Sequence, residues 1–475
     1  MSSKAGWLVP VCIVGAAVMT TVGVAALGQP AGTPLIPNLQ PFPNLTGTSQ
    51  TLNSAGAIDL GNPFFQELGT NGRTCASCHL PDQSWTIAAA SVKARFDATD
   101  GLDPIFRTND GSNCDHDIDT STLSGRQNAY SLLTSRGLIR IAINVPASAE
   151  FEVVSVQNPY GCDEKSVLSM YRRPLPSTSL RALSAVMWDG RESSASSTQP
   201  ISFATNPSDL LFDLRHQSVD ATLGHAQAAV PPTDEQQTRI VEFEMGLSTA
   251  QGSDKVAGHL DTLGAKGGPV RLSQEDFFVG VNDPLGGNPV GTAFTPTVFT
   301  LFDSWSNLTD DGEAADARRA IARGQSLFNS KTIHITGVAG LNDELGVRDI
   351  PGTCGTCHDS PNIGNHSLPV PLNIGVADMD SPLDVSYLPI ITLRNKSTHQ
   401  KVKTTDPGRA LISGKWKDIG KVKGPILRGL ASRAPYFHNG SAATLADVMD
   451  FYNTRFNLNL TAGEKSDFIA FLNSL

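Results

Sequence analysis

The sequence predicts a mainly α-helical protein of two tandem domains, and three observations lead to this prediction. The pattern Cys-x-x-Cys-His occurs twice, at residues 75–79 and 354–358. A similar apolar segment precedes each copy, at residues 62–68 and 320–328, so the chain carries a degenerate internal repeat. The chain has 475 residues, enough for two domains, and its 43 glycines and 30 prolines indicate short helices joined by many loops.

Each Cys-x-x-Cys-His motif predicts covalent attachment of one haem. Two thiols at this spacing can add to the vinyl groups of the porphyrin, and the adjacent imidazole then reaches the iron. The alternatives are a thioredoxin-like dithiol and half of a zinc ribbon. Cysteine pairs that share zinc normally lie within roughly 20 residues of each other, and neither alternative explains the histidine. The attachment and ligand residues are therefore Cys75, Cys78 and His79 for one haem, and Cys354, Cys357 and His358 for the other.

The first predicted domain covers residues 29–315 and includes an insertion at about residues 91–170. We expect residues 62–68 to begin this domain as a helix that packs a Phe or Leu edge against the haem. In the insertion, turn signals alternate with β-branched runs at residues 139–145 and 151–156. These runs predict a small sheet that packs onto the first haem domain.

The second predicted domain covers residues 316–475 and follows a polar, turn-rich segment. Residues 444–447 and 461–464 each fit a capping box, in which a threonine hydroxyl caps a free N–H and an acid three residues later reaches back. Two C-terminal helices should begin there. Met449 and Tyr452 lie about one turn apart on one face of the first of these helices.

The N-terminal residues 1–28 form a predicted signal peptide or membrane anchor. One lysine precedes an apolar run from residue 7 to residue 27, which is longer than a usual signal core and just long enough to span a bilayer. Cleavage would release a periplasmic protein, whereas retention would anchor it to the inner membrane. The formal net charge of −10 excludes a broad nucleic-acid surface.

Cys114 and Cys162 are left over after haem attachment, apart from one cysteine in the export segment. In an oxidising compartment they can form a disulfide. The alternative is two unrelated buried thiols, because spacing alone does not bring two side chains together.

Three further segments carry a resemblance to a known family. They are residues 187–191 (Met-Trp-Asp-Gly-Arg), 423–430 and 434–441 (Ala-Pro-Tyr-Phe-His-Asn-Gly-Ser). Together with both haem motifs they resemble the bacterial di-haem cytochrome c peroxidase and MauG family over most of the chain. The resemblance implies two cytochrome c-like domains. It also implies that the N-terminal haem is the peroxide site and that the C-terminal haem is six-coordinate and transfers electrons.

The resemblance also implies a sixth ligand for the second haem. Family members place a methionine or a tyrosine in the helix after residue 444, and the matching residue here is Tyr452. Met449 lies one turn earlier, so helical geometry alone does not choose between the two. We favour Tyr452. A thioether ligand would raise the haem potential, whereas a phenolate would favour the ferric and higher states.

Residues that carry out peroxide chemistry follow from the same resemblance. Trp188 matches the tryptophan that lies between the two haems in this family. Peroxide cleavage also needs a group that moves a proton. Asp209 matches a family carboxylate, although with a shorter side chain, while His225, with Gln217 before it, is an alternative because histidine shuttles protons near neutral pH. We favour His225 and keep Asp209.

Haem propionates need positive partners, and residues 394–433 contain eleven Lys and Arg against two Asp. We assign Arg191, Lys423 and Arg428 to this role. The resemblance further implies a calcium ion at the domain interface, with the carbonyl of Pro435 as one candidate ligand.

The expected function is reduction of hydrogen peroxide to water with electrons from a small periplasmic cytochrome or cupredoxin. One alternative is a MauG-like oxidase that acts on a protein or organic substrate. The other is a di-haem electron carrier without enzymatic activity. The sequence leaves open whether the chain forms a homodimer.

Overall fold

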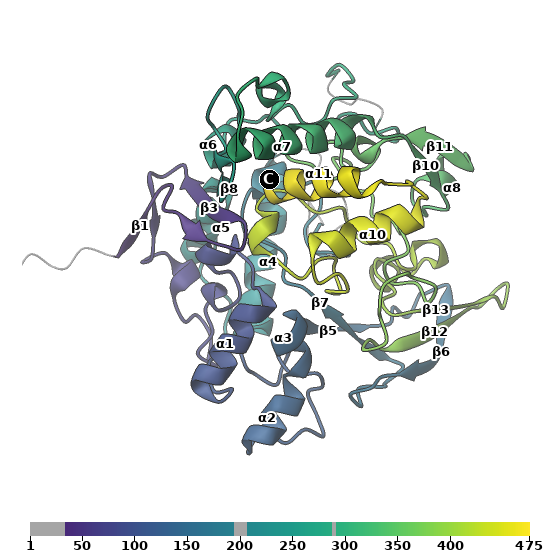
Figure 1. Cartoon of the computed structure of the whole chain (residues 1–475). Coiled ribbons are helices and arrows are strands. Elements are labelled where there is room, and N and C mark those ends of the chain that lie inside the picture. The colour runs from purple at the N-terminus through teal and green to yellow at the C-terminus, as the bar shows by residue number, and fades with distance from the viewer. Residues whose placement is uncertain (1–33, 194–206, 287–290) are drawn as a thin grey trace, which may run out of the picture.

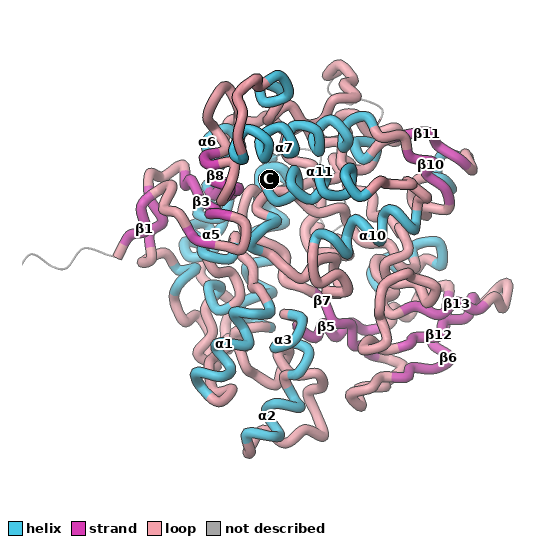
Figure 2. Tube along the Cα trace, in the orientation of Figure 1, coloured by secondary structure: helices cyan, strands magenta, loops and turns pink. Residues whose placement is uncertain are grey.

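A computed structural model describes residues 34–193, 207–286 and 291–475 (Figure 1). The export segment therefore lies outside the described residues. Helices, small antiparallel sheets of two to four strands, and long connecting loops make up this part of the chain (Figure 2). The loop-rich character matches the prediction, but strands contribute more to the fold than a mainly α-helical description suggests.

Three helices surround the second Cys-x-x-Cys-His motif. They are α7 (Glu313–Ser330), α10 (Leu445–Arg455) and α11 (Ala462–Asn473). Both predicted capping boxes are confirmed, because Thr444 caps α10 and Thr461 caps α11 with the acid reaching back in each case. Helices α7 and α11 pack side by side (Figure 1). Gly324 allows this close approach, since a Cβ atom there would lie 2.0 Å from the backbone oxygen of Asp467.

The core beneath α7 and α11 draws on a wider part of the chain than the second predicted domain. Phe299, Phe302 and Trp305 are fully buried in it together with Phe328 and Phe471. Residues before the predicted boundary at 315/316 thus pack under the helices that follow it. The boundary itself stays a prediction.

The predicted helix at residues 62–68 is wrong. Only a 3-10 turn forms there, η1 (Pro63–Phe65), capped by Asn62, and the chain is already extended at residue 66. Helix α5 (Asp234–Gly246) covers this region instead, and the Phe64 and Phe243 rings lie 5.1 Å apart.

The two haem motifs nevertheless share one feature of the predicted internal repeat, a phenylalanine that packs near the motif histidine. The ring of Phe64 lies 6.3 Å from the ring of His79, and the ring of Phe328 lies 6.2 Å from the ring of His358. Each motif histidine thus has one phenylalanine from the preceding segment at an equivalent distance.

The predicted insertion contains the two expected strands, β5 (Ile139–Asn144) and β6 (Phe151–Gln157). They do not form one sheet on the first domain. Strand β5 pairs with β7 (Val167–Arg172), whereas β6 pairs with β12 (Ile390–Asn395), which also pairs with β13 (Lys401–Thr404). The insertion therefore joins the second half of the chain (Figure 1). It also contains helices that the sequence reading missed, namely α1 (Ala89–Thr99), α2 (Leu123–Ala129) and α3 (Ser131–Arg136).

The remaining sheets are small and antiparallel. A four-stranded sheet has the order β2-β3-β8-β9, and two-stranded sheets pair β1 with β4 and β10 with β11. The bounds are β1 (Leu35–Pro37), β2 (Phe42–Pro43), β3 (Gly47–Asn53), β4 (Ala57–Asp59), β8 (Leu247–Asp254), β9 (Gly258–His259), β10 (Ile333–Thr336) and β11 (Asp349–Gly352). Further helices are α4 (Pro207–Gly224), α6 (Gly268–Leu272), α8 (Asn342–Leu345) and α9 (Ala410–Ser413).

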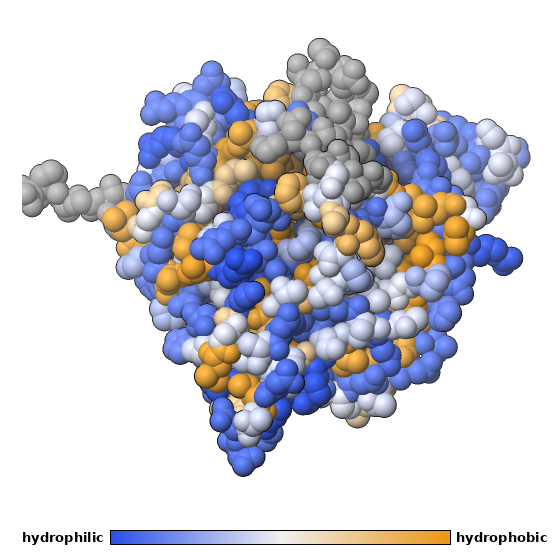
Figure 3. All heavy atoms as spheres, turned by 90° about the horizontal axis from the view of Figure 1, so that it is seen from above, coloured by the Kyte–Doolittle hydropathy of each residue, from blue (hydrophilic) through white to orange (hydrophobic). Residues whose placement is uncertain are grey.

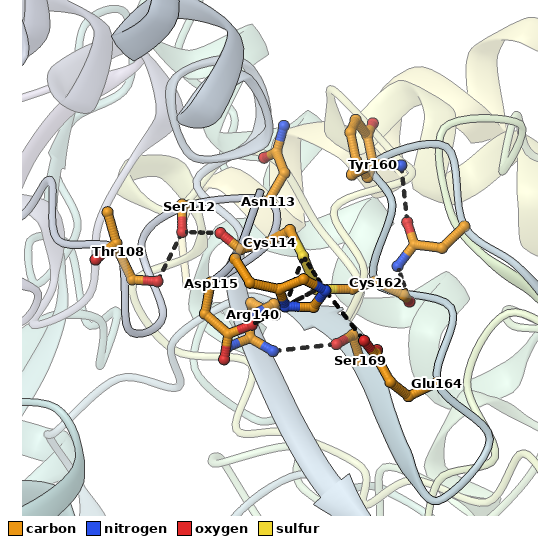
Figure 4. The surroundings of a disulfide bond; sticks show 12 residues. Thr108, Ser112, Asn113, Cys114, Asp115, Arg140, Tyr160, Cys162, Glu164 and Ser169 are labelled. Carbon is orange, nitrogen blue, oxygen red and sulfur yellow. Dashed lines mark hydrogen bonds and ion pairs between the residues drawn. A yellow bond between two sulfur atoms is a disulfide. The ribbon is translucent and has the colours of Figure 1, made fainter. Parts of the chain in front are cut away.

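The predicted disulfide between Cys114 and Cys162 is present (Figure 4). It joins the loop before α2 to the loop after β6 and closes a sequence separation of 48 residues. Arg140 on β5 lies beside it and forms an ion pair with Asp115. The bond therefore ties the insertion together.

Hydrophilic and apolar side chains are interspersed on the face shown in Figure 3, with the apolar ones in small patches. Among the residues that the structure describes, no helix combines the length and apolar character needed to cross a membrane.

Candidate haem sites

Both Cys-x-x-Cys-His motifs fold into the same tight turn. The first begins with the 3-10 turn η2 (Cys75–Ser77) and the second with η6 (Cys354–Thr356). In each, the carbonyl of the first cysteine accepts a hydrogen bond from the backbone N–H of the motif histidine, at 3.0 Å. The turn therefore brings two thiols and one imidazole together in both halves of the chain.

The two motif histidines are held in the same protonation state. Nδ1 of His79 lies 3.0 Å from the carbonyl of Trp85, and Nδ1 of His358 lies 2.7 Å from the carbonyl of Gly364. Since a carbonyl oxygen only accepts, each Nδ1 carries the proton and each Nε2 keeps a free lone pair. Burial also lowers the pKa of both imidazoles to about 4. Both rings are thus neutral at pH 7, as iron ligation requires.

The four motif cysteines are free thiols, although the same structure joins Cys114 to Cys162. Burial raises the pKa of Cys75, Cys354 and Cys357 to about 12. Zinc ligation and disulfide exchange both need a thiolate, which a low pKa favours. A thioether to haem carries no charge, so these buried environments are compatible with haem attachment.

A cavity lies beside the first motif, and the residues that line it suit a haem. Cys75, Cys78 and His79 form part of its wall. Most of the remaining wall is apolar, with Leu180, Leu183, Val186, Leu214, Ile240 and Ile426 among the contributors. Several cationic side chains also reach it, which suits a flat apolar ligand that carries carboxylates at one edge.

Five residues singled out in the sequence line this cavity, namely Trp188, Arg191, Gln217, His225 and Lys423. Trp188 is partly buried, and its Nε1–H donates to the carbonyl of Arg173 at 2.8 Å. Lys423 is buried, donates to the carbonyl of Ala185 at 2.9 Å, and has a pKa lowered to about 7 by burial. A nearby anion would favour its charged form.

His225 is anchored by a buried carboxylate, Asp110, that the sequence analysis did not identify. Its Nδ1 is hydrogen bonded to Asp110, which also forms an ion pair with Arg73. Burial opposes ionisation of Asp110, but His225 and Arg73 together hold its pKa below the usual value. The carboxylate therefore stays ionised and fixes the orientation of the His225 ring at the cavity wall.

Asp209 and Arg428 have different surroundings from those expected. Of the residues that the structure describes, neither belongs to the cavity wall. Asp209 lies in the first turn of α4. The buried guanidinium of Arg428 donates to the backbone carbonyls of Gly268, Asn362 and Leu475. Arg428 thus ties three chain segments together, which gives no support to a propionate role.

At the second motif, Tyr452 and Met449 occupy different environments. Tyr452 is packed with Cys354 and Cys357 in one apolar cluster, and its ring stacks on Phe456 at 6.1 Å. Burial raises its pKa, and its hydroxyl has no hydrogen-bond partner among the residues with described structure. Met449 is only 4% exposed and belongs to the core between α7 and α11. Tyr452 therefore shares an apolar cluster with the two motif cysteines, and none of the described residues forms a hydrogen bond with its hydroxyl.

Two residues near His79 were not predicted from the sequence. The hydroxyl of Ser177 lies 3.0 Å from Nδ1 of His79. Glu244 is buried next to Ser177 and lines the cavity, and burial raises its pKa to about 7. Both lie far from the motif in sequence and belong to no recognisable pattern, so no local signal could have identified them.

Comparison with known proteins gives partial matches. No family model matches the chain. The chain is 33% identical to cytochrome-c peroxidase IdrP2 of Denitromonas iodatirespirans over 135 residues, which make up 26% of this chain and 36% of that protein. It is 27% identical to cytochrome-c peroxidase IdrP1 of Pseudomonas sp. (strain SCT) over 194 residues, which make up 37% of this chain and 43% of that protein. The matches thus span less than half the length of these relatives.

Two solved structures share low similarity with the chain. One is a MauG-like protein associated with microbial copper homeostasis, with 16% identity, a TM-score of 0.36 and coverage of 88% of each chain. The other is a tyrosine-to-methionine variant of the diheme peroxidase BthA from Burkholderia thailandensis, with 14% identity, a TM-score of 0.30 and coverage of 93% of this chain and 94% of that one.

The proteins that match in sequence are cytochrome-c peroxidases. In the present chain, both Cys-x-x-Cys-His motifs fold in the same way. Over about a quarter to a third of its length, this chain is therefore similar in sequence to bacterial cytochrome-c peroxidases.

Proposed function

We propose that this protein is a periplasmic peroxidase that reduces hydrogen peroxide to two waters, taking up two protons and two electrons. The electrons would come from a small cytochrome or cupredoxin. One observation carries the proposal: the cavity beside His79 also holds His225, an ionisable side chain anchored by the buried Asp110. Reduction of peroxide requires a cavity that admits it and a group that moves a proton.

Bound haem at the His79 site would supply an iron that reduces peroxide, and bound haem at the His358 site would supply an electron store. Side chains of the protein would hold the iron and move the protons. His79 keeps Nε2 free for iron because Nδ1 donates to a carbonyl. His225 can take or give a proton at Nε2, while Asp110 holds Nδ1. Asp209, in the first turn of α4, is the second candidate for this step.

Electrons would enter through the His358 site and pass Trp188. Trp188 lines the first cavity, and its ring lies 6.0 Å from the ring of the buried His438. Tyr452 is the proposed sixth ligand at the His358 site, supported by its contact with the attachment cysteines and by its lack of another hydrogen bond in the described chain. Arg191 and Lys423 line the cavity and are the proposed propionate partners.

The calcium ion near Pro435 belongs to the same proposal as a consequence of the family resemblance. The domain boundary at 315/316 rests on the polar segment before it, and the signal peptide or N-terminal anchor rests on the apolar run at residues 7–27. A second candidate function is a MauG-like oxidase of a protein or organic substrate. The observation that favours it is the position of Tyr452 in the same apolar cluster as Cys354 and Cys357, because a phenolate ligand would stabilise the ferric and higher states.

The experiment is steady-state turnover of the purified di-haem protein with hydrogen peroxide and reduced cytochrome c. We expect turnover in the wild type and a loss of at least about 100-fold in His225→Ala, the usual contribution of a proton-transfer group. His259→Ala is the matched control, because His259 is an exposed histidine on β9. Asp209→Asn tests the alternative residue in the same assay.

Three outcomes separate the candidate functions. If peroxide leaves the Soret band of the wild type unchanged, the electron-carrier function holds and the peroxidase proposal fails. If peroxide changes the Soret band but reduced cytochrome c and reduced cupredoxins are not consumed, the MauG-like oxidase is favoured. If Asp209→Asn loses activity and His225→Ala does not, the proton-transfer role moves to Asp209.

A further inference from the structure

Three buried side chains converge directly behind the second haem motif. They are Asp283, in the segment before α7, Asp359, which follows His358, and His366, in the loop after the motif. One ligand atom from each lies within 4.8 Å of the other two. The three side chains are almost completely removed from solvent, with residue exposures of 7%, 0% and 4%.

Each of the three side chains is oriented by a bond at its outer atom. Leu285 donates its backbone N–H to Oδ1 of Asp283 at 2.7 Å, and Ser367 donates its backbone N–H to Oδ1 of Asp359 at 2.6 Å. Nδ1 of His366 donates to the carbonyl of Cys357 at 3.1 Å. This is the arrangement that fixes metal ligands in proteins, where the atom turned away from the metal is hydrogen bonded to a neighbour.

The inner atoms of the three side chains lie close together and are not hydrogen bonded to any described residue. Within the described part of the chain, Oδ2 of Asp283, Oδ2 of Asp359 and Nε2 of His366 make no hydrogen bond. Oδ2 of Asp283 lies 3.0 Å from Nε2 of His366, yet the two atoms do not meet hydrogen-bond geometry. A protonated His366 would satisfy Oδ2 of Asp283 in this pair, but Oδ2 of Asp359 would still be buried without a partner among the described residues, which is costly unless a further positive charge lies beside it.

We propose that Asp283, Asp359 and His366 bind one divalent transition-metal ion of the Zn²⁺ type. Zinc takes histidine nitrogen together with carboxylate oxygen, and three protein ligands leave a fourth position for water. Calcium and magnesium prefer all-oxygen sites, so the imidazole argues against both. This site is separate from the calcium ion expected near Pro435 and does not depend on the proposed peroxidase activity.

The ion would stabilise the loop whose backbone holds the His358 ring in place. Residues 359–366 include Gly364, whose carbonyl accepts the Nδ1–H of His358. Asp283 comes from a segment that precedes α7, so a metal bound to all three residues would join that segment to the haem loop. The proposed role is structural support of the second haem site.

The test measures zinc in the intact di-haem protein. The holoprotein is treated with chelator, dialysed against Zn²⁺ and analysed for iron and zinc by mass spectrometry. We expect two irons and one zinc per chain. In Asp283→Asn and His366→Gln we expect the zinc to be lost, while the iron content stays at two per chain because the haems are covalently attached. The control is His334→Gln, because His334 and Asp349 form an exposed pair of the same residue types, 3.1 Å apart.

Two results would overturn the proposal. If the wild type takes up no zinc, the three side chains share protons instead of a metal. If the variants bind as much zinc as the wild type, the ion lies elsewhere. Should a variant lose haem, anomalous diffraction at the zinc edge from wild-type crystals would locate the ion directly, and the absence of a peak between the three side chains would reject the site.

Discussion

Replacing Gly324 by alanine should weaken the contact between α7 and α11 and destabilise the second haem region. Gly324 lies in the middle of α7, where it faces α11. An added Cβ would lie 2.0 Å from the backbone oxygen of Asp467 and 2.7 Å from the Cβ of Phe471. Backbone cannot move aside as the end of a flexible side chain can, so the two helices would have to separate.

The size of the effect follows from two opposing terms. Alanine in a helix interior gains about 1 kcal/mol over glycine. Overpacking of a well-packed contact costs about 1–3 kcal/mol. Because the closest approach is to backbone at 2.0 Å, we expect a cost near the upper end and a net loss of about 2 kcal/mol in the free energy of unfolding. The shift would also disturb Phe328, which packs against His358.

Urea unfolding of the holoprotein, followed by circular dichroism and by the Soret band, measures this change. Gly463→Ala is the matched control, because Gly463 lies in α11 with no atom within 4 Å of an added Cβ. The control should be neutral or more stable by up to about 1 kcal/mol. If Gly324→Ala proves as stable as Gly463→Ala, the close approach of α7 and α11 is not what the structure indicates, and the reasoning fails.

Three further predictions concern the disulfide, a buried ion pair and the second haem. Replacing Cys114 and Cys162 by serine should lower the free energy of unfolding by about 4 kcal/mol, the loop-closure value for a separation of 48 residues, and a change below about 1 kcal/mol in urea unfolding would contradict this. Burial raises the pKa of Asp189, but Arg172 and Arg191 outweigh it and hold the value at about 2, below the usual 3.8. Ionised Asp189 therefore stabilises the fold above about pH 4, and this stability is lost as the pH falls from about 4 to about 2. Asp189→Asn should cost roughly 3 kcal/mol at pH 7 and remove that acid dependence, which urea midpoints measured at several pH values would test. Tyr452→Phe should change the spectrum of one haem only, whereas Met449→Leu, a change within the apolar core, should change neither; the reverse result would make Met449 the ligand.

The geometry of the two Cys-x-x-Cys-His motifs could be predicted from the sequence because it is local. Five consecutive residues bring two thiols and an imidazole together, and both copies fold into the same turn. The caps of α10 and α11 were predictable for the same reason, since threonine and an acid three residues later satisfy each other within one turn. Local patterns fail where tertiary packing overrides them, as at residues 62–68, where only one 3-10 turn forms and helix α5 packs against it.

Tertiary structure alone decided what surrounds each motif. Strand β6 could have paired with a neighbour in sequence, but it pairs with β12, more than 200 residues away, because a strand's partner depends on which edge the fold brings to it. Asp110 beside His225, Ser177 beside His79, and Asp283 beside Asp359 and His366 are likewise contacts between distant segments. Covalent spacing brings two thiols and an imidazole together in each motif, whereas long-range packing determines which groups lie around each motif histidine.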